Sequence, residues 1–129
     1  MKECLFIRRK REFFRLPFAE IMYIESWKNY IQIVTAKSKF MVKTTISGVE
    51  KLLPRNQFCR IHRGYIVALS AITGFNQHKV HLSQKDLPLS EQYRKVLLSC
   101  IITLEDHTLE KNDTSSQNFD GLTNQLGLN

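Results

Sequence analysis

Hydrophobic and polar residues alternate along the first third of the chain with the period of two that is typical of half-buried β-strands. The segment "CLFIRRKREFFRLPF" predicts two short strands around a basic turn near Arg9 and Lys10. The segments "AEIMYIES" and "NYIQIVT" predict a hairpin that turns at Trp27 and Lys28. After the turn "AKSK", the segment "FMVKTT" is rich in β-formers and predicts another strand.

The period then changes to that of a helix in "ISGVEKLLP". Hydrophobic residues recur there at helical spacing, at Ile46, Val49, Leu52 and Leu53. Ser47 and Glu50 have the spacing of a capping box, which predicts the start of a short helix, and Pro54 would end it.

The second half predicts more strands and one further helix. "FCRIHRGYIVALSAITGF" is expected to be extended or broken, and "HKVHLSQKDLPLS" to form two strands about a Ser-Gln-Lys-Asp turn. "EQYRKVLLSC" predicts a helix with one apolar face, made of Tyr93, Val96, Leu97 and Cys100. Residues 105–129 are polar, so we expect a domain at 1–104 and a C-terminal tail at 105–129. The fold class is therefore mainly β with one or two short helices.

Composition supports one globular domain without a membrane span. The chain has 129 residues, of which 43% are hydrophobic, and no apolar run approaches the roughly 20 residues of a spanning helix. The N-terminal "MKECLFIRRKREFF" has charges where a signal peptide has its apolar run. Three cysteines form no disulfide framework and suit a reducing compartment, so we predict a cytoplasmic protein.

The distribution of charge indicates a polyanionic partner. Residues 1–104 contain 18 basic and 7 acidic residues, whereas residues 105–129 contain 1 basic and 5 acidic residues. A basic body is typical of nucleic-acid-binding domains. A soluble surface that is simply basic explains the charge almost equally well, so the charge alone does not decide the function.

Metal and enzyme chemistry have weak support. Two pairs, Cys59 with His62 and His78 with His81, have a spacing seen in zinc sites. On a strand, however, residues three apart point to opposite faces, and neither pair contains the Gly or Pro of a tight knuckle. No catalytic motif is present, and nothing would orient a Cys59–His62 pair. We therefore predict no metal, no cofactor and no enzymatic activity.

Three polar stretches coincide with expected turns, and they carry the nucleic-acid hypothesis. These are "WKNY" (27–30), "RIHRGY" (60–65) and "SEQYRK" (90–95). Arginine can donate two parallel hydrogen bonds to guanine, asparagine can pair with adenine, and tyrosine can donate to phosphate. Loops are commonly polar without any binding role, so each stretch alone is weak.

At these same stretches the sequence resembles the LytTR family, the DNA-binding domains of bacterial response regulators and related transcription factors. "FCRIHRGYIV" is similar to the family signature Phe-x-Arg-x-His-Arg-Ser-Tyr-Ile-Val. "IMYIES" with "NYIQIVT", "TTISGVEKLLP" and "LPLSEQYRKVL" resemble its other blocks, in family order. The resemblance extends from about Phe6 to Ile102.

The resemblance implies an elongated fold of layered antiparallel β-sheets, in which loops between strands enter successive grooves of double-stranded DNA. It also implies promoter direct repeats, bound by two protomers as a dimer on DNA. A structural role for Arg60, paired with a carboxylate such as Glu25, is the alternative to a contact with DNA. The DNA-binding residues that match the family's contacting loops, with their neighbours, are Lys28, Asn29, Tyr30, Arg60, His62, Arg63, Gln92, Tyr93 and Arg94.

Four positions depart from the family pattern. Gly64 stands where the family usually has Ser, and Ala68 replaces a common Asn. Glu91 and Gln92 stand where Arg is frequent, and a carboxylate near DNA repels phosphate. These departures are expected to alter the strength or the base preference of binding rather than the fold.

The leading hypothesis is therefore a sequence-specific transcriptional regulator that binds double-stranded DNA. One alternative is a non-specific or single-stranded nucleic-acid-binding β module that uses tyrosines as stacking platforms. Another is a protein-interaction domain that has lost DNA binding. No receiver domain precedes residue 1, so we expect a stand-alone regulator or a fragment; a fragment would connect to a sensor kinase pathway.

Overall fold

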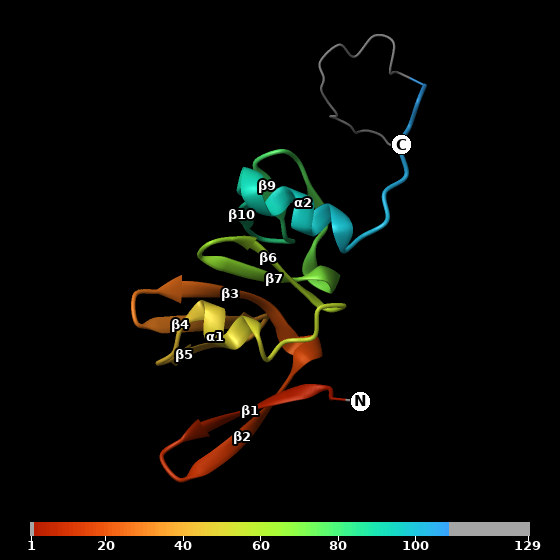
Figure 1. The fold of residues 1–129 in the computed structure, drawn as a ribbon. Coiled ribbons are helices and arrows are strands. Elements are labelled where there is room, and N and C mark those ends of the chain that lie inside the picture. Colours follow the sequence, from red (N-terminus) through yellow and green to blue (C-terminus); the bar gives the residue numbers. More distant parts are fainter. Residues whose placement is uncertain (1, 109–129) are drawn as a thin grey trace.

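The computed structural model describes residues 2–108, which form three antiparallel sheets and two α-helices (Figure 1). The first sheet contains β1 (Cys4–Arg9) and β2 (Glu12–Pro17). The central sheet has the order β5-β4-β3-β7-β6 and contains β3 (Ile21–Trp27), β4 (Tyr30–Thr35), β5 (Lys39–Val42), β6 (Phe58–His62) and β7 (Tyr65–Ala68). The third sheet has the order β10-β9-β8 and contains β8 (Gly74–Phe75), β9 (Lys79–His81) and β10 (Asp86–Pro88).

The helices are short; the first lies between β5 and β6 in the sequence, and the second follows β10. They are α1 (Ile46–Glu50) and α2 (Glu91–Ser99), with single 3-10 turns at η1 (Phe18–Glu20) and η2 (Leu69–Ala71). The predicted mainly β class with two short helices is confirmed, as are the layered antiparallel sheets. No helix in residues 2–108 is long and apolar enough to cross a membrane.

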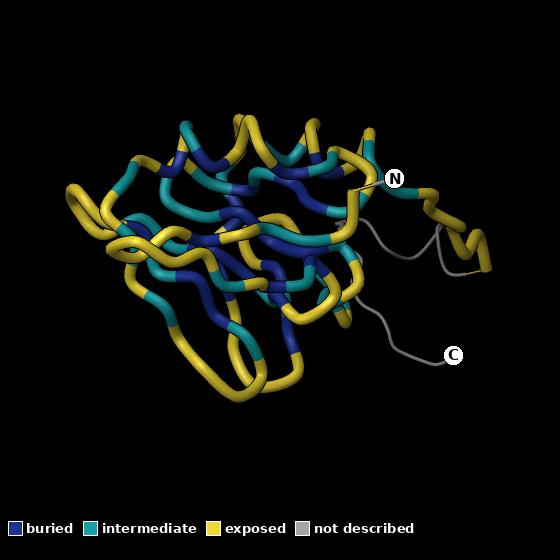
Figure 2. Tube along the Cα trace, turned by 90° about the horizontal axis from the view of Figure 1, so that it is seen from below, coloured by how far each residue is buried: buried dark blue, intermediate teal, exposed yellow. Residues whose placement is uncertain are grey.

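The central sheet is buried on both faces, which makes the molecule layered. One face contributes Ile24 and Ile66 to a cluster that the first sheet and α1 cover. The other face contributes Tyr23 and Val67 to a cluster that the third sheet and α2 cover. Adjacent residues in a strand point to opposite faces, so β3, β4, β6 and β7 supply both clusters, whereas the edge strand β5 contributes Phe40 and Val42 to the first cluster only. Figure 2 shows the result, with buried segments inside and exposed turns at the ends of strands.

Helix α1 starts differently from the prediction. Its N-cap is Thr45, whose Oγ1 accepts a hydrogen bond from the Gly48 backbone N–H at 3.0 Å. The predicted capping box of Ser47 and Glu50 is therefore wrong, because Ser47 already lies in the first helical turn. The helix ends at Glu50, so Leu52 falls beyond it and remains 66% exposed.

Helix α2 has Ser90 as its N-cap and a narrower apolar face than predicted. The Oγ of Ser90 accepts a hydrogen bond from the Tyr93 backbone N–H at 3.3 Å. Leu97 is fully buried, and Tyr93 and Cys100, at i−4 and i+3 from it, are half-buried. The predicted burial of Val96 is wrong: this residue is 41% exposed, because it lies about 100° around the helix from Leu97.

The division predicted at residue 104 lies beyond the last helix. Helix α2 ends at Ser99, and no regular secondary structure follows in residues 102–108. The rest of the predicted tail, 109–129, lies outside the described residues.

Candidate nucleic-acid interface

Three segments that are distant in the sequence meet at one side of the molecule, at the left of Figure 1. They are the β3–β4 turn, the β6–β7 turn and the N-terminus of α2. The backbone N–H of Ser26 donates to the carbonyl of Gly64 at 2.9 Å, and that of Ser90 donates to the carbonyl of Ile61 at 3.0 Å. Backbone hydrogen bonds therefore hold the three polar stretches together.

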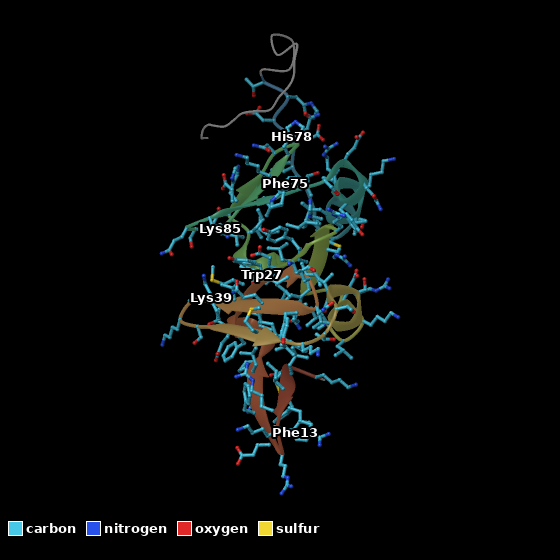
Figure 3. The ribbon with its side chains drawn as sticks, turned by 90° about the vertical axis from the view of Figure 1, so that its left-hand side faces the viewer. Phe13, Trp27, Lys39, Phe75, His78 and Lys85 are labelled. Carbon is cyan, nitrogen blue, oxygen red and sulfur yellow. The ribbon has the colours of Figure 1, made fainter. Side chains whose placement is uncertain are left out.

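The β3–β4 turn is a two-residue hairpin tip made of Lys28 and Asn29. Trp27 pairs with Tyr30 at its base, and these side chains are 50% and 43% exposed. Lys28 has a φ of 55°, in the left-handed region that is unfavourable for a residue with a side chain. A strained lysine at an exposed tip fits a role in binding rather than in stability. Figure 3 looks at this side of the molecule, with Trp27 near its middle.

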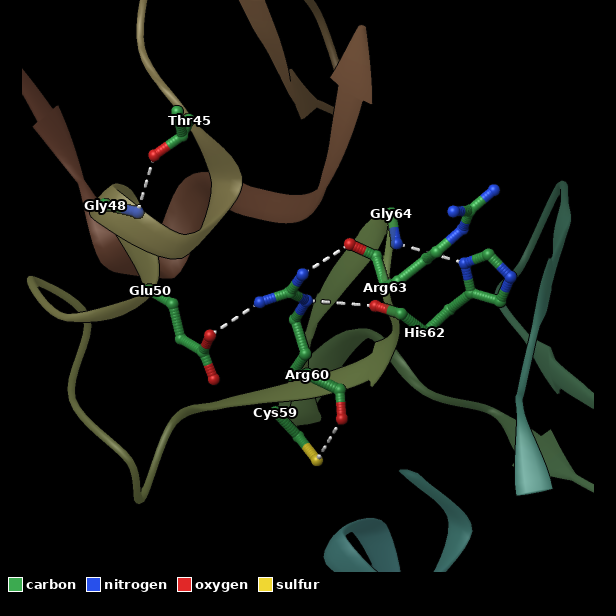
Figure 4. A network of polar contacts seen from close by, with 8 residues as sticks. All are labelled: Thr45, Gly48, Glu50, Cys59, Arg60, His62, Arg63 and Gly64. Atoms are coloured by element: carbon green, nitrogen blue, oxygen red, sulfur yellow. Dashed lines mark hydrogen bonds and ion pairs between the residues drawn. The ribbon is translucent and has the colours of Figure 1, made fainter. Parts of the chain in front are cut away.

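The Arg60 side chain supports the β6–β7 turn through hydrogen bonds to its backbone (Figure 4). The Arg60 guanidinium donates from Nε to the His62 carbonyl at 2.9 Å and from Nη2 to the Arg63 carbonyl. Its Nη1 forms an ion pair with Oε1 of Glu50 at 2.7 Å. The Arg60 side chain is only 9% exposed. The expected pairing with Glu25 is therefore wrong; Glu50 at the end of α1 is the partner.

A β-bulge at Ile61 shapes the same turn. The register between β6 and β7 shifts between Arg60 and His62, which leaves Ile61 without a partner residue. Ile61 is fully buried in the cluster beneath α2, and its carbonyl accepts the hydrogen bond from the α2 N-cap. The bulge thus joins the loop that carries Arg63 to the helix that carries Gln92.

His62 is oriented and kept neutral by its surroundings. The Gly64 backbone N–H donates to its Nδ1 at 3.0 Å, so the proton of the neutral ring resides on Nε2. Partial burial lowers the pKa of His62 from 6.5, and the charges of Arg63 and Arg60 lower it further. His62 therefore presents an Nε2–H donor at neutral pH, and a phosphate or base acceptor can receive it.

A shallow depression lies between the two strand turns. Its lining residues are Glu25, Ser26, His62, Arg63, Gly64 and Tyr65. Burial raises the pKa of Tyr65, and the neighbouring Glu25 raises it further, so the phenol remains protonated. Arg63 is exposed at the rim. The depression combines two donors, Arg63 and His62, with one acceptor, Glu25, which suits discrimination between base edges more than uniform attraction of phosphate.

At the N-terminus of α2, the three predicted residues have different environments. Gln92 is exposed, beside the exposed Glu91. The Tyr93 ring lies 5.7 Å from the Arg60 guanidinium carbon, in a cation–π contact. Arg94 donates from Nε and Nη2 to the Gln77 carbonyl, at 3.1 and 2.7 Å. Gln92 is thus available to a ligand, whereas Tyr93 and Arg94 hold α2 in place.

The structure therefore sorts the nine predicted residues into two groups. Those with exposed side chains are Lys28, Asn29, Tyr30, Arg63 and Gln92, and they are joined by His62, which is half-buried and keeps an Nε2–H donor. Those engaged within the fold are Arg60, Tyr93 and Arg94. Their contacts with DNA stay a prediction. Sequence reasoning missed Glu50, because its position suggested a capping role for α1 and nothing linked it to Arg60.

The residues considered for metal binding do not gather. Among residues 2–108, no group of three or more His, Cys, Asp or Glu side chains is placed to hold a metal ion. Burial, together with the adjacent Cys100 thiol, raises the pKa of Cys59 to about 12, so this thiol stays protonated. The His81 Nδ1 lies 2.7 Å from Oδ1 of Asp86.

Comparison with known proteins decides the family. The sequence matches the LytTr DNA-binding domain family over residues 11–101, which includes all three segments of the interface. The chain belongs to the LytTR family. The predicted resemblance is thereby confirmed, and the chain contains a DNA-binding domain.

Two known proteins that are similar to this chain add detail. The chain is 31% identical over 61 residues to the CO-responsive transcriptional regulator RcoM of Rhodospirillum rubrum; the match covers 47% of this chain and 26% of RcoM. The chain thus spans about a quarter of that regulator. The fold of this chain is similar to that of the LytTr DNA-binding domain of a putative methyl-accepting/DNA response regulator from Bacillus cereus, with a TM-score of 0.65 and 20% identity. That match covers 78% of this chain and 97% of the other.

Proposed function

We propose that the protein is a transcriptional regulator that recognises a specific sequence in double-stranded DNA through its LytTR domain. The observation that carries this proposal is the joining of three polar segments by backbone hydrogen bonds at one side of the fold. Two hairpin turns and the first turn of α2 present Lys28, Arg63 and Gln92 at separations set by the fold, as readout of a duplex requires.

Duplex DNA fits this surface better than single strands. Recognition of single strands depends on aromatic rings that are free to stack on bases. Tyr93 is already covered by Arg60, and Tyr65 is half-buried against His62 and Tyr23. Among the tyrosines considered as stacking platforms, only Tyr30 is exposed. The three segments therefore offer many polar donors, and their exposed rings, Trp27 and Tyr30, are confined to one hairpin.

We also propose that the protein binds DNA as a pair of protomers. Two protomers would occupy two direct repeats in a promoter, with each protomer placing its three loops along one face of the duplex. RcoM is named as a CO-responsive regulator, and it extends well beyond the segment shared with this chain. If this chain is part of a longer regulator, we expect that regulator to act in a sensor kinase pathway.

The experiment that tests this function is selection of tight binders from random duplex DNA at near-physiological salt. Enrichment of a spaced direct repeat is the expected result. Enrichment of a single half-site would retain specific recognition and remove the paired arrangement. Equal binding of all sequences that vanishes as the salt concentration rises would reduce the protein to a non-specific basic module. Absence of any salt-sensitive binding would favour the protein-interaction alternative.

A further inference from the structure

The β1–β2 hairpin carries a dense cluster of cations outside the three segments of the interface. Between Arg8 and Arg15 the sequence "RRKREFFR" contains five basic residues and one acidic residue. In the described part of the chain, none of these cations takes part in an ion pair with a carboxylate. Like charges this close repel one another, so the cluster is unfavourable for the isolated domain and favours a bound polyanion.

The hairpin tip has the same construction as the tip of the β3–β4 turn. Lys10 and Arg11 form a two-residue turn between the paired residues Arg9 and Glu12. Lys10 has a φ of 57°, almost the value found at Lys28. These two lysines are the only non-glycine residues with positive φ in residues 2–108. Two hairpins thus hold a strained, exposed lysine at corresponding positions of their tips.

The outer face of this hairpin alternates phenylalanine and arginine. Phe6 pairs with Arg15 and Arg8 pairs with Phe13 across the two strands, so the four side chains share one face. Phe6 and Phe13 are 60% and 62% exposed. The Arg8 guanidinium carbon lies 5.8 Å from the centre of the Phe13 ring. An arginine held by an aromatic ring is partly ordered in advance and loses less freedom when it binds a phosphate.

The hairpin is held in a defined position relative to the central sheet. Arg9 donates from Nη2 to the Met41 carbonyl at 2.9 Å, and its guanidinium lies over the Phe14 ring. The Phe14 ring in turn contacts Phe40, with ring centres 6.0 Å apart. The tip points to the same side as the β3–β4 and β6–β7 turns (Figure 1), and Phe13 lies at one end of that side in Figure 3.

We propose that the β1–β2 hairpin is a further DNA-binding surface, which contacts phosphates of the same duplex beyond the base pairs that the three loops read. The tip residues Lys10 and Arg11, together with Arg8, would bind the backbone and extend the bound length of DNA. The family match begins at Arg11 and so assigns no role to β1. This inference rests on the proposed recognition of duplex DNA.

The test compares two duplexes and three proteins. One duplex is the selected core site alone, and the other is the same core with about 10 bp, roughly one helical turn, added on each side. The proteins are the wild type, the hairpin variant Lys10→Asn/Arg11→Gln and the control variant Lys37→Gln/Lys39→Gln. Asn tolerates a positive φ, so the hairpin variant keeps its turn. The control removes the same charge from exposed lysines at the far end of β4.

The wild type and the control should bind the flanked duplex more tightly than the core, and the hairpin variant should lose that preference. Its salt dependence on the flanked duplex should flatten by about 0.9 for each phosphate contact removed. An equal preference for the flanked duplex in all three proteins, or no such preference in the wild type, would overturn the proposed surface. Recognition by the three segments of the interface would remain intact. Failure of the wild type to bind the core specifically would reject both proposals.

Discussion

Arg60 and Glu50 form an ion pair of 2.7 Å between β6 and the end of α1, and this pair supports the β6–β7 turn. The other guanidinium nitrogens of Arg60 donate to the carbonyls of His62, the last residue of β6, and Arg63, the first residue of the turn. Arg60 therefore positions the turn rather than reaching out from it. A planar fork with several fixed donors is needed for this role, and lysine does not supply one.

Replacing Arg60 with Lys should reduce stability by about 1–2 kcal/mol, because hydrogen bonds to a charged group are lost while the charge remains. DNA affinity should fall as the turn loosens, with little change in salt dependence. Denaturant unfolding and DNA titrations at several salt concentrations measure both effects. Glu50→Gln is the matched control, and it should show a smaller loss of stability. Loss of specificity at a single base pair, with unchanged stability, would instead make Arg60 a direct contact.

Replacing Arg63 with Ala should weaken binding to the selected site by about 1–3 kcal/mol and relax specificity at one position. Arg63 is exposed at the rim of the depression, so its stability contribution should be small. Competition with a set of single-base variants of the site measures the effect. Arg55→Ala, an exposed arginine after α1, serves as the charge control. An equal loss on all sequences would identify Arg63 as a phosphate contact only.

Replacing Gly64 with Ser should strengthen DNA binding. A Cβ at this position meets its nearest atom, Nδ1 of His62, at 3.6 Å, and the backbone φ is not positive, so the side chain fits. The added hydroxyl can donate one hydrogen bond, worth about 0.5–1.5 kcal/mol. Gly64→Ala separates the hydroxyl from the stiffening of the backbone. Equal affinity of the Ser and Ala variants would show that the hydroxyl reaches no acceptor.

Replacing Lys28 with Gly should raise the stability of the free domain and weaken its binding to DNA. Glycine relieves the strain of a φ of 55°, and we expect a gain of about 1 kcal/mol in the free energy of unfolding. Loss of the charge should flatten the salt dependence by about 0.9 if one phosphate contact is removed. Thermal unfolding and salt titrations measure the two effects separately. Lys28→Asn should lose the same charge with less change in stability.

The titration of His62 should make stability fall in mildly acidic solution. Its pKa is lowered in the folded protein from an unfolded value near 6.5, so the unfolded state binds more protons between the two values. The contribution is therefore fully present above pH 6.5 and is lost as the pH falls through the lowered pKa. Unfolding curves of the wild type and His62→Gln between pH 5 and 8 measure this contribution of His62 to the free energy of unfolding. Parallel pH profiles for the two proteins would contradict the assignment.

Some features were predictable because they depend on neighbours in the chain. The alternation in "NYIQIVT" predicted a strand, although the turn predicted at Trp27 and Lys28 lies one residue later, at Lys28 and Asn29. The start of α1 was mispredicted because both Thr45 and Ser47 can cap a helix, and burial of Ile46 favours the earlier start. The exposure of Val96 was missed because the neighbouring Leu97 occupies the buried face.

The sequence by itself determined the class of the fold, the family and the three polar segments, since each depends on residue types and spacings that are local. Only the tertiary structure decided which residues are available to a ligand. Arg60 and Arg63 are both arginines of one motif, yet a contact with Glu50, ten residues earlier, holds the first inside while the second remains exposed. Such long-range pairings depend on how the layers pack, and local patterns do not record them.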